Sequence, residues 1–320
     1  MRHVAISAAV ALFLMMMNTQ GFAAQLRLGA RQSPIPISDC EDVTQPGNYA
    51  LTNDLVLTAE RQEYGGGGDC LVISSSDVRI DLAGWTISIA CPPFSSCPSE
   101  YGVVGGIGIE VMNGADHVSI SNGSVEGFVY GIAGEADHIS ASNLRLVSVL
   151  GVALIDVSRS TFRNITFEGA DTSYHALNGP ILFLNGGGKN VFMNLSGQVG
   201  SDVGGPDGID VVNSNANLIS GVNLRNTGCG GTDIRLLSGS NFNFITNSTL
   251  FDECGGGIEV DMGSRHNVIV KNAVTIASPP DVFALFDQNP NCGSDAWLDN
   301  GFSNIFAPGQ ISASPVNCLH

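Results

Sequence analysis

Basic residues are scarce in this chain. Its 320 residues include 13 Lys and Arg against 30 Asp and Glu, which gives a formal net charge of −17 at pH 7. Such a chain repels the phosphates of nucleic acids and anionic membrane surfaces, and it repels acidic polysaccharides unless cations bridge the two. We therefore expect no nucleic-acid partner and no membrane insertion. The expected partners are neutral, cationic or bridged by a metal.

Long apolar runs are missing everywhere but at the N-terminus. Residues 4–17 are apolar, follow a basic residue, and precede the small residues Ala23 and Ala24. This is the pattern of a secretory signal peptide, and it is too short for a membrane span. We expect residues 1–24 to be removed and the protein to be secreted, to the periplasm, the cell surface or the medium.

Helix-length amphipathic patterns are also missing, and a short β pattern recurs instead. A Gly-Ile or Gly-Val strand start and a turn are followed by a second short strand that ends at an Asn position. A period of 21 to 30 residues is typical of a solenoid, because such small units bury their inward side chains only by stacking. The Asn position falls at Asn122, Asn143, Asn164, Asn194, Gly221, Asn247 and Asn272.

The first strand of each unit has an inward aliphatic residue followed by an outward one. Alternation along a strand places Ile209 inside and Asp210 outside. On the next two units it places Arg235 and Glu259 outside in the same way. Turn residues kept in register at this period fit a parallel β-helix better than a sandwich. The aligned inward residues are Ile109, Ile132, Val152, Ile181, Ile209, Ile234 and Ile258.

The Gly-Ile-x-Val and Val-x-Ile-x-Asn strands between residues 78 and 274 resemble those of the pectin lyase-like superfamily. Both ends are similar to the caps of its bacterial secreted members. The resemblance implies an all-β, right-handed parallel β-helix solenoid with disulfide-clasped N- and C-terminal caps. We expect residues 281–287 to form an amphipathic cover at the C-terminal end. The expected parts are a signal peptide (1–24), an N-terminal cap (25–77), β-helix repeats (78–280) and a C-terminal cap (281–320), with 25–320 as one domain.

All eight cysteines lie after the predicted signal peptide. An even number in a secreted chain favours disulfides over free thiols or zinc. Cys229 and Cys254 occupy the same turn on successive units, which stack about 4.8 Å apart, within the reach of a disulfide. We therefore pair these two. Proximity and the two ends suggest the remaining pairs, Cys91 with Cys97, Cys40 with Cys70, and Cys292 with Cys318.

One outward column carries alternating charges. Asp210 and Glu259 are two units apart, about 9 to 10 Å between backbones, with Arg235 between them. Inverting glycosidases hold their paired carboxyl groups roughly 6.5 to 9.5 Å apart. A second explanation is structural, since Arg235 neutralises two acids that would otherwise repel each other. Asp261 also flanks the column, and the candidate catalytic residues are Asp207, Asp210, Asp233, Arg235, Glu259 and His175.

The resemblance argues against one mechanism. Polygalacturonase-like members carry further acids and a histidine on successive units, but here only Asp207 matches; the equivalent later positions read Gly231-Thr232 and 255–257, all glycine. Pectate lyase-like members use calcium and a basic residue, and this chain matches them by residue type alone. We expect no required cofactor, with calcium as the ion that suits the acids. The residues of suitable type are Asp207, Asp210, Asp233 and Arg235.

A second column, five residues before the Asn position, is basic: His117, His138, Arg159 and Lys189. Local pairing with Asp116 and Asp137 explains it. A metal site on the two histidines is the alternative, although the sequence offers no third ligand in register.

Two functions remain open on the sequence. The first is a carbohydrate-active protein that binds a polysaccharide or cell-surface glycan along its solenoid and cleaves it as a lyase or glycoside hydrolase. The second is a non-catalytic cell-envelope or extracellular protein used in structure or adhesion. The second gains from the missing catalytic motifs and from the few aromatic residues expected on the outer faces. Trp85 and Trp297 are both expected in a cap or in the core.

Overall fold

A computed structural model describes residues 33–58, 68–90, 106–148, 150–169, 180–199, 207–227, 231–277, 283–305 and 313–314. The chain divides into two units, residues 1–33 and residues 34–320, and the strands lie in the second. The predicted signal peptide lies outside the described residues. Among the described residues, no helix has the length and apolar character needed to cross a membrane.

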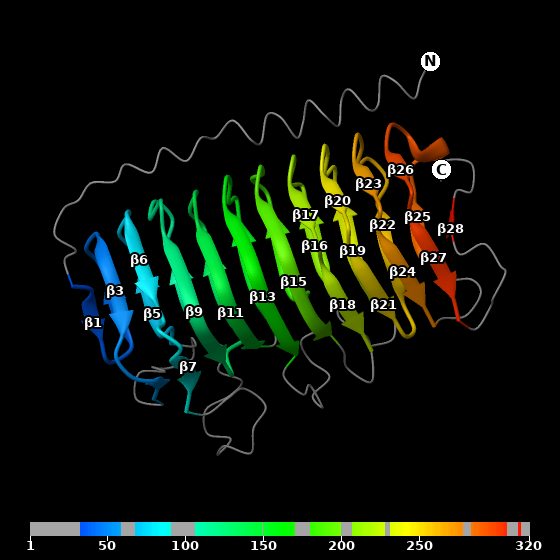
Figure 1. The fold of residues 1–320 in the computed structure, drawn as a ribbon. Helices are drawn as coiled ribbons and strands as arrows, with labels where there is room; N and C mark the ends of the chain where they lie inside the picture. Colours follow the sequence, from blue (N-terminus) through cyan, green and yellow to red (C-terminus); the bar gives the residue numbers. More distant parts are fainter. Residues whose placement is uncertain are drawn as a thin grey trace. The chain divides into compact units, whose positions relative to one another are not determined.

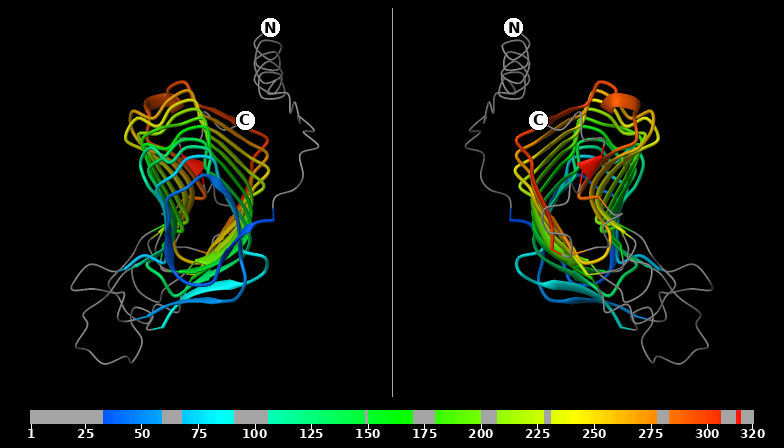
Figure 2. Two further views of the ribbon diagram at one scale, coloured as in Figure 1. Left: turned by 90° about the vertical axis from the view of Figure 1, so that its left-hand side faces the viewer. Right: turned by 90° about the vertical axis from the view of Figure 1, so that its right-hand side faces the viewer.

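The predicted right-handed parallel β-helix solenoid is confirmed. In the described chain, the strands pair in parallel within two sheets, and they follow one another in chain order along the stack (Figure 1). Views along the stack show successive rungs, the single turns of the solenoid, superimposed around a common interior (Figure 2). Parallel pairing runs from Ile35 to Ser314, which is farther at both ends than the range 78–280 expected for the repeats.

The strand that opens most rungs belongs to an eleven-stranded sheet, which carries the candidate site. Each strand is hydrogen-bonded to the equivalent strand of the rungs before and after it. Its strands are β2 (Glu41–Val43), β5 (Leu71–Ile73), β8 (Ile107–Val111), β10 (Tyr130–Gly134), β12 (Leu150–Ile155), β14 (Leu182–Asn185), β16 (Ile209–Val212), β19 (Thr232–Leu237), β22 (Gly256–Val260), β25 (Leu285–Asp287) and β28 (Ala313–Ser314).

The second sheet wraps around the remaining two sides of the solenoid. Its strands are β1 (Ile35–Ile37), β3 (Gly47–Leu51), β4 (Leu55–Leu57), β6 (Val78–Asp81), β7 (Thr86–Ile89), β9 (Ser119–Glu126), β11 (Ser140–Ser148), β13 (Thr161–Gly169), β15 (Val191–Val199), β17 (Leu218–Ser220), β18 (Asn223–Asn226), β20 (Phe244–Thr246), β21 (Thr249–Asp252), β23 (Val268–Val270), β24 (Ala273–Ile276), β26 (Ala296–Leu298) and β27 (Gly301–Asn304). A short 3-10 helix, η1 (Pro290–Cys292), precedes β26.

The recurrent Asn position is the bend between these two sides. Asn143, Asn164 and Asn194 have positive φ, which Asn tolerates better than most residues. Each donates its side-chain amide to the side-chain oxygen of the Asn one rung before it, at 3.0 to 3.1 Å. The prediction is wrong at the last rung, where Lys271 has the positive φ. Asn272 follows it, buried, and accepts a hydrogen bond from the Ser248 N–H.

The predicted inward residues are confirmed on every rung but one. Leu182, rather than Ile181, lies opposite Val152 and Ile209. Both candidates are apolar and buried, so an apolar pattern alone could not choose between them. This shift of one residue matters for the site, because it places Phe183 in the outward column.

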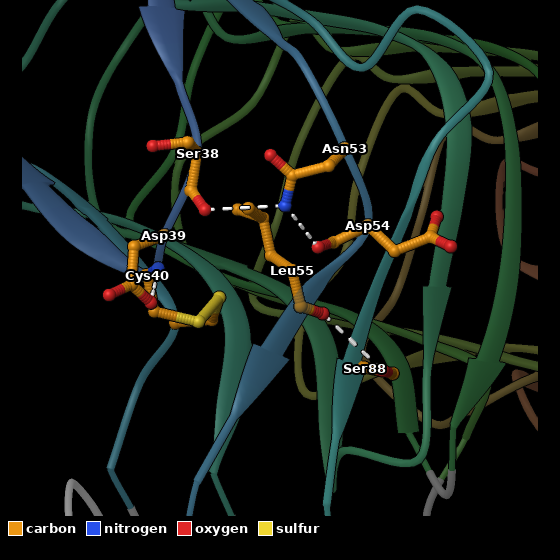
Figure 3. Close-up of a disulfide and its surroundings, with 8 residues drawn as sticks. Ser38, Asp39, Cys40, Asn53, Asp54, Leu55 and Ser88 are labelled. Atoms are coloured by element: carbon orange, nitrogen blue, oxygen red, sulfur yellow. Dashed lines mark hydrogen bonds between the residues drawn. A yellow bond between two sulfur atoms is a disulfide. The ribbon is translucent and has the colours of Figure 1, made fainter.

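The predicted disulfide between Cys40 and Cys70 is confirmed (Figure 3), with 4.5 Å between the Cα atoms. It joins the residue just before β2 to the residue just before β5, at the N-terminal end of the stack. Cys254 and Cys292 are also disulfide-bonded. The partners predicted for them, Cys229 and Cys318, lie outside the described residues, as do Cys91 and Cys97, so these three pairings stay predictions.

The C-terminal end differs from expectation. Leu285 to Asp287 form β25, which pairs with β22 and extends the eleven-stranded sheet by another rung. These residues therefore do not form an amphipathic cover. Leu285 is inward and buried while Phe286 is outward, the same alternation as on the rungs before it.

Candidate functional site

The charged column exists as predicted. Asp210 on β16 lies opposite Arg235 on β19, and Arg235 lies opposite Glu259 on β22. Their strand neighbours Ile209, Ile234 and Ile258 are buried inside the solenoid, so alternation turns the charged side chains outward. The outward column continues to an aromatic residue at each end, Phe183 on β14 and Phe286 on β25.

Arg235 joins two carboxylates. Its Nε donates to Asp210 Oδ1 at 2.9 Å and its Nη2 to Asp210 Oδ2 at 3.0 Å, which is a bidentate fork. Nη2 also pairs with Asp207 Oδ2, and Asp207 Oδ1 accepts a hydrogen bond from the Thr232 N–H at 2.8 Å. The side chains of Asp210, Asp207 and Arg235 are 8%, 16% and 29% exposed. The neutralising role predicted for Arg235 is confirmed for Asp210, but its second ion pair is with Asp207 and not with Glu259 as predicted.

Asp207 is the carboxyl group of this cluster whose pKa lies near neutrality. Burial, together with the charge of Asp210, raises its pKa to about 6, although Arg235 and the Thr232 N–H act in the opposite direction. A carboxyl group with a pKa near neutrality can both hold and release a proton under physiological conditions. Asp207 is therefore the candidate acid or base of this cluster.

A cavity of about 400 Å³ opens beside Glu259. Phe283 and Phe286 form its aromatic side, with ring centroids 5.4 Å apart and planes 16° apart. Glu259 lines the cavity and accepts a hydrogen bond from the Gln288 side chain. Its lining residues are Gly231, Thr232, Cys254, Gly255, Gly256, Gly257, Ile258, Glu259, Phe283 and Phe286.

Asp233 does not belong to this outward cluster, contrary to the prediction. It is fully buried. The aligned residues on the two adjacent rungs are Gly208 and Gly257, where an added Cβ would press against the core residues Leu224 and Val274. Position 233 therefore points inward, as does its neighbour Ile234. Two consecutive inward residues break strict strand alternation, so the sequence pattern did not predict the direction of Asp233. Burial and the nearby charge of Asp252 raise the pKa of Asp233 well above its usual range.

The remaining predicted site residues have other places. Asp261 accepts a hydrogen bond from the Met262 N–H at 2.7 Å and so caps a turn. His175 lies outside the described residues. Asp207, Asp210, Arg235 and Glu259 are the predicted residues that the fold brings together.

The basic second column is a turn. His117, His138, Arg159 and Lys189 all have positive φ, and the two imidazole rings stack with centroids 4.6 Å apart. Asp137 accepts a hydrogen bond from the Ser158 N–H at 2.7 Å, which fits the local capping role. Among the described residues, no three His, Cys, Asp or Glu side chains gather in a way that suits a metal ion.

The aromatic residues of the site were missed from the sequence. Phe183, Phe283 and Phe286 are half-buried, so the expectation of few outward aromatics does not hold on this face. The segments Leu-Phe-Leu at 182–184 and Leu-Phe-Asp at 285–287 could have predicted them. In each, the central Phe lies between two inward, buried residues and so points outward. Trp297 is buried as expected, whereas Trp85 is 40% exposed and is not a core residue.

These features define a class: a parallel β-helix protein with a charged, aromatic-flanked column on one sheet. No known family profile matches the chain, and no curated protein matches it significantly. Among solved structures it is similar to the Dettilon tailspike protein gp208, with a TM-score of 0.52 and 13% identity over 83% of this chain and 53% of that one. The chain thus spans about half the length of that tailspike.

Two other solved structures are similar to a lesser degree. The catalytic domain of a GH87 α-1,3-glucanase has a TM-score of 0.46 and 13% identity, covering 88% of this chain and 63% of that one. The surface adhesin PfbA of Streptococcus pneumoniae has a TM-score of 0.46 and 11% identity, covering 87% and 89%. At 13% identity, the similarity to the tailspike supports the fold alone.

Proposed function

We propose that this protein binds a polysaccharide or cell-surface glycan along the outward column from β14 to β25, outside the cytoplasm. The observation that carries the proposal is the succession Phe183, Asp210, Arg235, Glu259 and Phe286 on five adjacent strands. Aromatic rings offer apolar faces on which sugars stack, and charged side chains between them hydrogen-bond to hydroxyl groups. Strand spacing of about 4.8 Å repeats these contacts along a line that suits an extended chain.

The charge of the column narrows the class of glycan. Asp207 and Asp210 pair with one cation, Arg235, and Glu259 lies opposite it on the next strand. An acidic sugar chain would meet net negative charge there, so neutral or amine-bearing chains are the expected ligands and uronic acid polymers require bridging calcium.

The contacts of Asp210 favour binding without cleavage. Both of its oxygens accept from Arg235, so it is not free to act on a substrate as the second carboxylate of a glycosidase. The non-catalytic alternative, a display or adhesion protein of the cell surface, is therefore supported by geometry. Cleavage is the second candidate, and it is favoured by one observation, the pKa of about 6 of Asp207.

Glycan binding is tested through the aromatic end of the column. Phe286→Ala is expected to weaken binding at least about tenfold, because it removes roughly 1.5–3 kcal/mol of apolar contact. The measurement is titration calorimetry with neutral, amine-bearing and acidic oligosaccharides, with and without calcium. Phe242→Ala is the matched control, since Phe242 is exposed on a turn and stacks on His266. Equal losses in both variants, or no binding of any glycan, would reject the proposal.

Cleavage is tested on the glycans that bind. If Asp207 is the general acid, turnover falls as the pH rises through about 6, and Asp207→Asn lowers it by at least about a hundredfold while binding persists. New reducing ends report hydrolysis, and absorbance at 235 nm reports lyase products. A wild-type protein that binds a glycan and yields neither product is an adhesion or display protein.

A further inference from the structure

A pair of carboxylates lies inside the solenoid at the corner between β21 and β19. Asp252 and Asp233 are both fully buried. Both oxygens of Asp233 and Oδ2 of Asp252 have no hydrogen-bond partner among the described residues, and neither side chain pairs with a described Lys, Arg or His. Buried carboxylates are costly unless hydrogen bonds, a counter-charge or a metal compensates them.

The aspartate at position 233 departs from the pattern of its own fold. On the rungs before and after, the aligned residues Gly208 and Gly257 have no side chain, and a Cβ at Gly208 would lie 2.9 Å from Leu224 Cδ1. The Asp233 carboxylate therefore occupies a position that, on the two neighbouring rungs, is filled by the core side chains Leu224 and Val274. Packing does not require an acid there.

The two carboxylates are near each other without being hydrogen-bonded to each other. The charge of Asp252 acts on Asp233, yet no hydrogen bond joins the two side chains. Asp252 Oδ1 is occupied, since it accepts from the Cys254 and Gly255 N–H groups. Its free Oδ2 and the Gly231 carbonyl both lie close to the point that a Cβ on Gly255 would occupy, Oδ2 at 2.9 Å. A side chain at position 255 would therefore clash with the Gly231 carbonyl, and glycine lets the two oxygens border the same backbone position.

We propose that one calcium ion bridges Asp233 and Asp252 at this corner, with the Gly231 carbonyl as a further ligand. Calcium takes carboxylate and carbonyl oxygens at about 2.3–2.6 Å in flexible geometry, which matches ligands drawn from a strand, a turn and a glycine. The cavity beside Glu259 is lined by Gly231 and by Gly255, so it reaches the backbone next to these carboxylates. The proposed ion would lie inside the solenoid, on residues other than those of the outward column, although the charge of Asp207 acts on Asp252. The proposal does not depend on glycan binding.

The test measures metal content and thermal stability of the full-length chain. After equilibration with calcium chloride and gel filtration, wild-type protein is expected to retain one calcium per chain by elemental analysis. Adding EDTA is expected to lower its Tm by roughly 5 °C, because an ion that binds the folded chain at many times its Kd stabilises it. Asp233→Asn and Asp233→Gly are expected to retain no calcium and to show no EDTA effect. Asp233→Gly guards against misfolding, because both neighbouring rungs have glycine there.

Asp42→Asn is the matched control. It removes the same charge from an exposed position on β2 of the same sheet, and it is expected to keep the calcium and the EDTA effect. A wild-type chain that holds no calcium and whose Tm does not respond to calcium or EDTA overturns the proposal. So does equal calcium retention by wild type and both Asp233 variants.

Discussion

Arg235→Met is expected to destabilise the protein by about 3–5 kcal/mol at pH 8, the cost of leaving buried carboxylates without their counter-charge. Asp207 and Asp210 are mostly buried and both pair with Arg235. Met fills a similar volume without the guanidinium, so the loss reports charge rather than packing. Urea unfolding followed by circular dichroism gives the free energy of unfolding of each variant.

The loss should depend on pH in a defined direction. Burial already raises the pKa of Asp207 to about 6 with Arg235 present, and removing the cation raises it further. A carboxyl group with a raised pKa in the folded state stabilises at low pH, and this contribution disappears as the pH rises through the folded-state value. Arg235→Met should therefore lose less stability at pH 5 than at pH 8.

Arg225→Met is the control for this experiment. Arg225 pairs with Glu253 at 2.9 Å and lies over the ring of Phe251, but its side chain is 59% exposed. Exposed pairs contribute about 1 kcal/mol or less. Equal destabilisation by the two substitutions would show that Asp207 and Asp210 do not need the cation. A loss from Arg235→Met that is the same at both pH values would show that the ionisation of Asp207 does not contribute to it.

Replacing both Cys40 and Cys70 with Ala is expected to cost about 3.5 kcal/mol, the chain-entropy value for a closed loop of 30 residues. Both cysteines are buried, and alanine avoids burying a hydroxyl group. Because each rung contacts mainly its neighbours, the loss should concentrate at the N-terminal end of the stack.

Hydrogen exchange followed by mass spectrometry checks this localisation. Amides of β1 to β5 should exchange faster in the double variant, while those of β19 and β22, several rungs away, should be unchanged. Uniform loss of protection along the whole stack would mean that the solenoid unfolds as one cooperative unit and that the disulfide stabilises all of it.

The contacts of Arg235 with Asp207 and Asp210 matter for function as well as for stability. Asp210 and Glu259 resemble a pair of catalytic acids in their spacing. However, both oxygens of Asp210 accept hydrogen bonds from Arg235, which neutralises its charge. The aromatic residues at the ends of the column and the cavity beside Glu259 remain available to a ligand. This combination is the reason that glycan binding is better supported than cleavage.

Much of the solenoid followed from the sequence because its signals are local and repeated. Alternation of apolar and polar residues predicted which side chains of β16, β19 and β22 turn outward, and register then placed Asp210, Arg235 and Glu259 in one column. The Asn turns were visible for the same reason, since only a few residue types tolerate positive φ. A second set of buried asparagines was not foreseen: Asn217, Asn243 and Asn267 each accept a hydrogen bond from the preceding rung.

Features that depend on strand register, or on distances between residues of different strands, could not be predicted from the sequence and were decided by the tertiary structure. A shift of one residue at Leu182 was invisible in an apolar pair, yet it places Phe183 beside Asp210. The direction of Asp233 depended on the backbone next to it, and its neighbour Asp252 comes from a different side of the solenoid. The sequence by itself determined a stack of parallel rungs and the line of charges along one sheet, because strand period and turn preference are properties of short segments. Only the tertiary structure decided which charges are paired, which are buried alone and where a cavity opens, because those depend on distances between segments that the chain order does not specify.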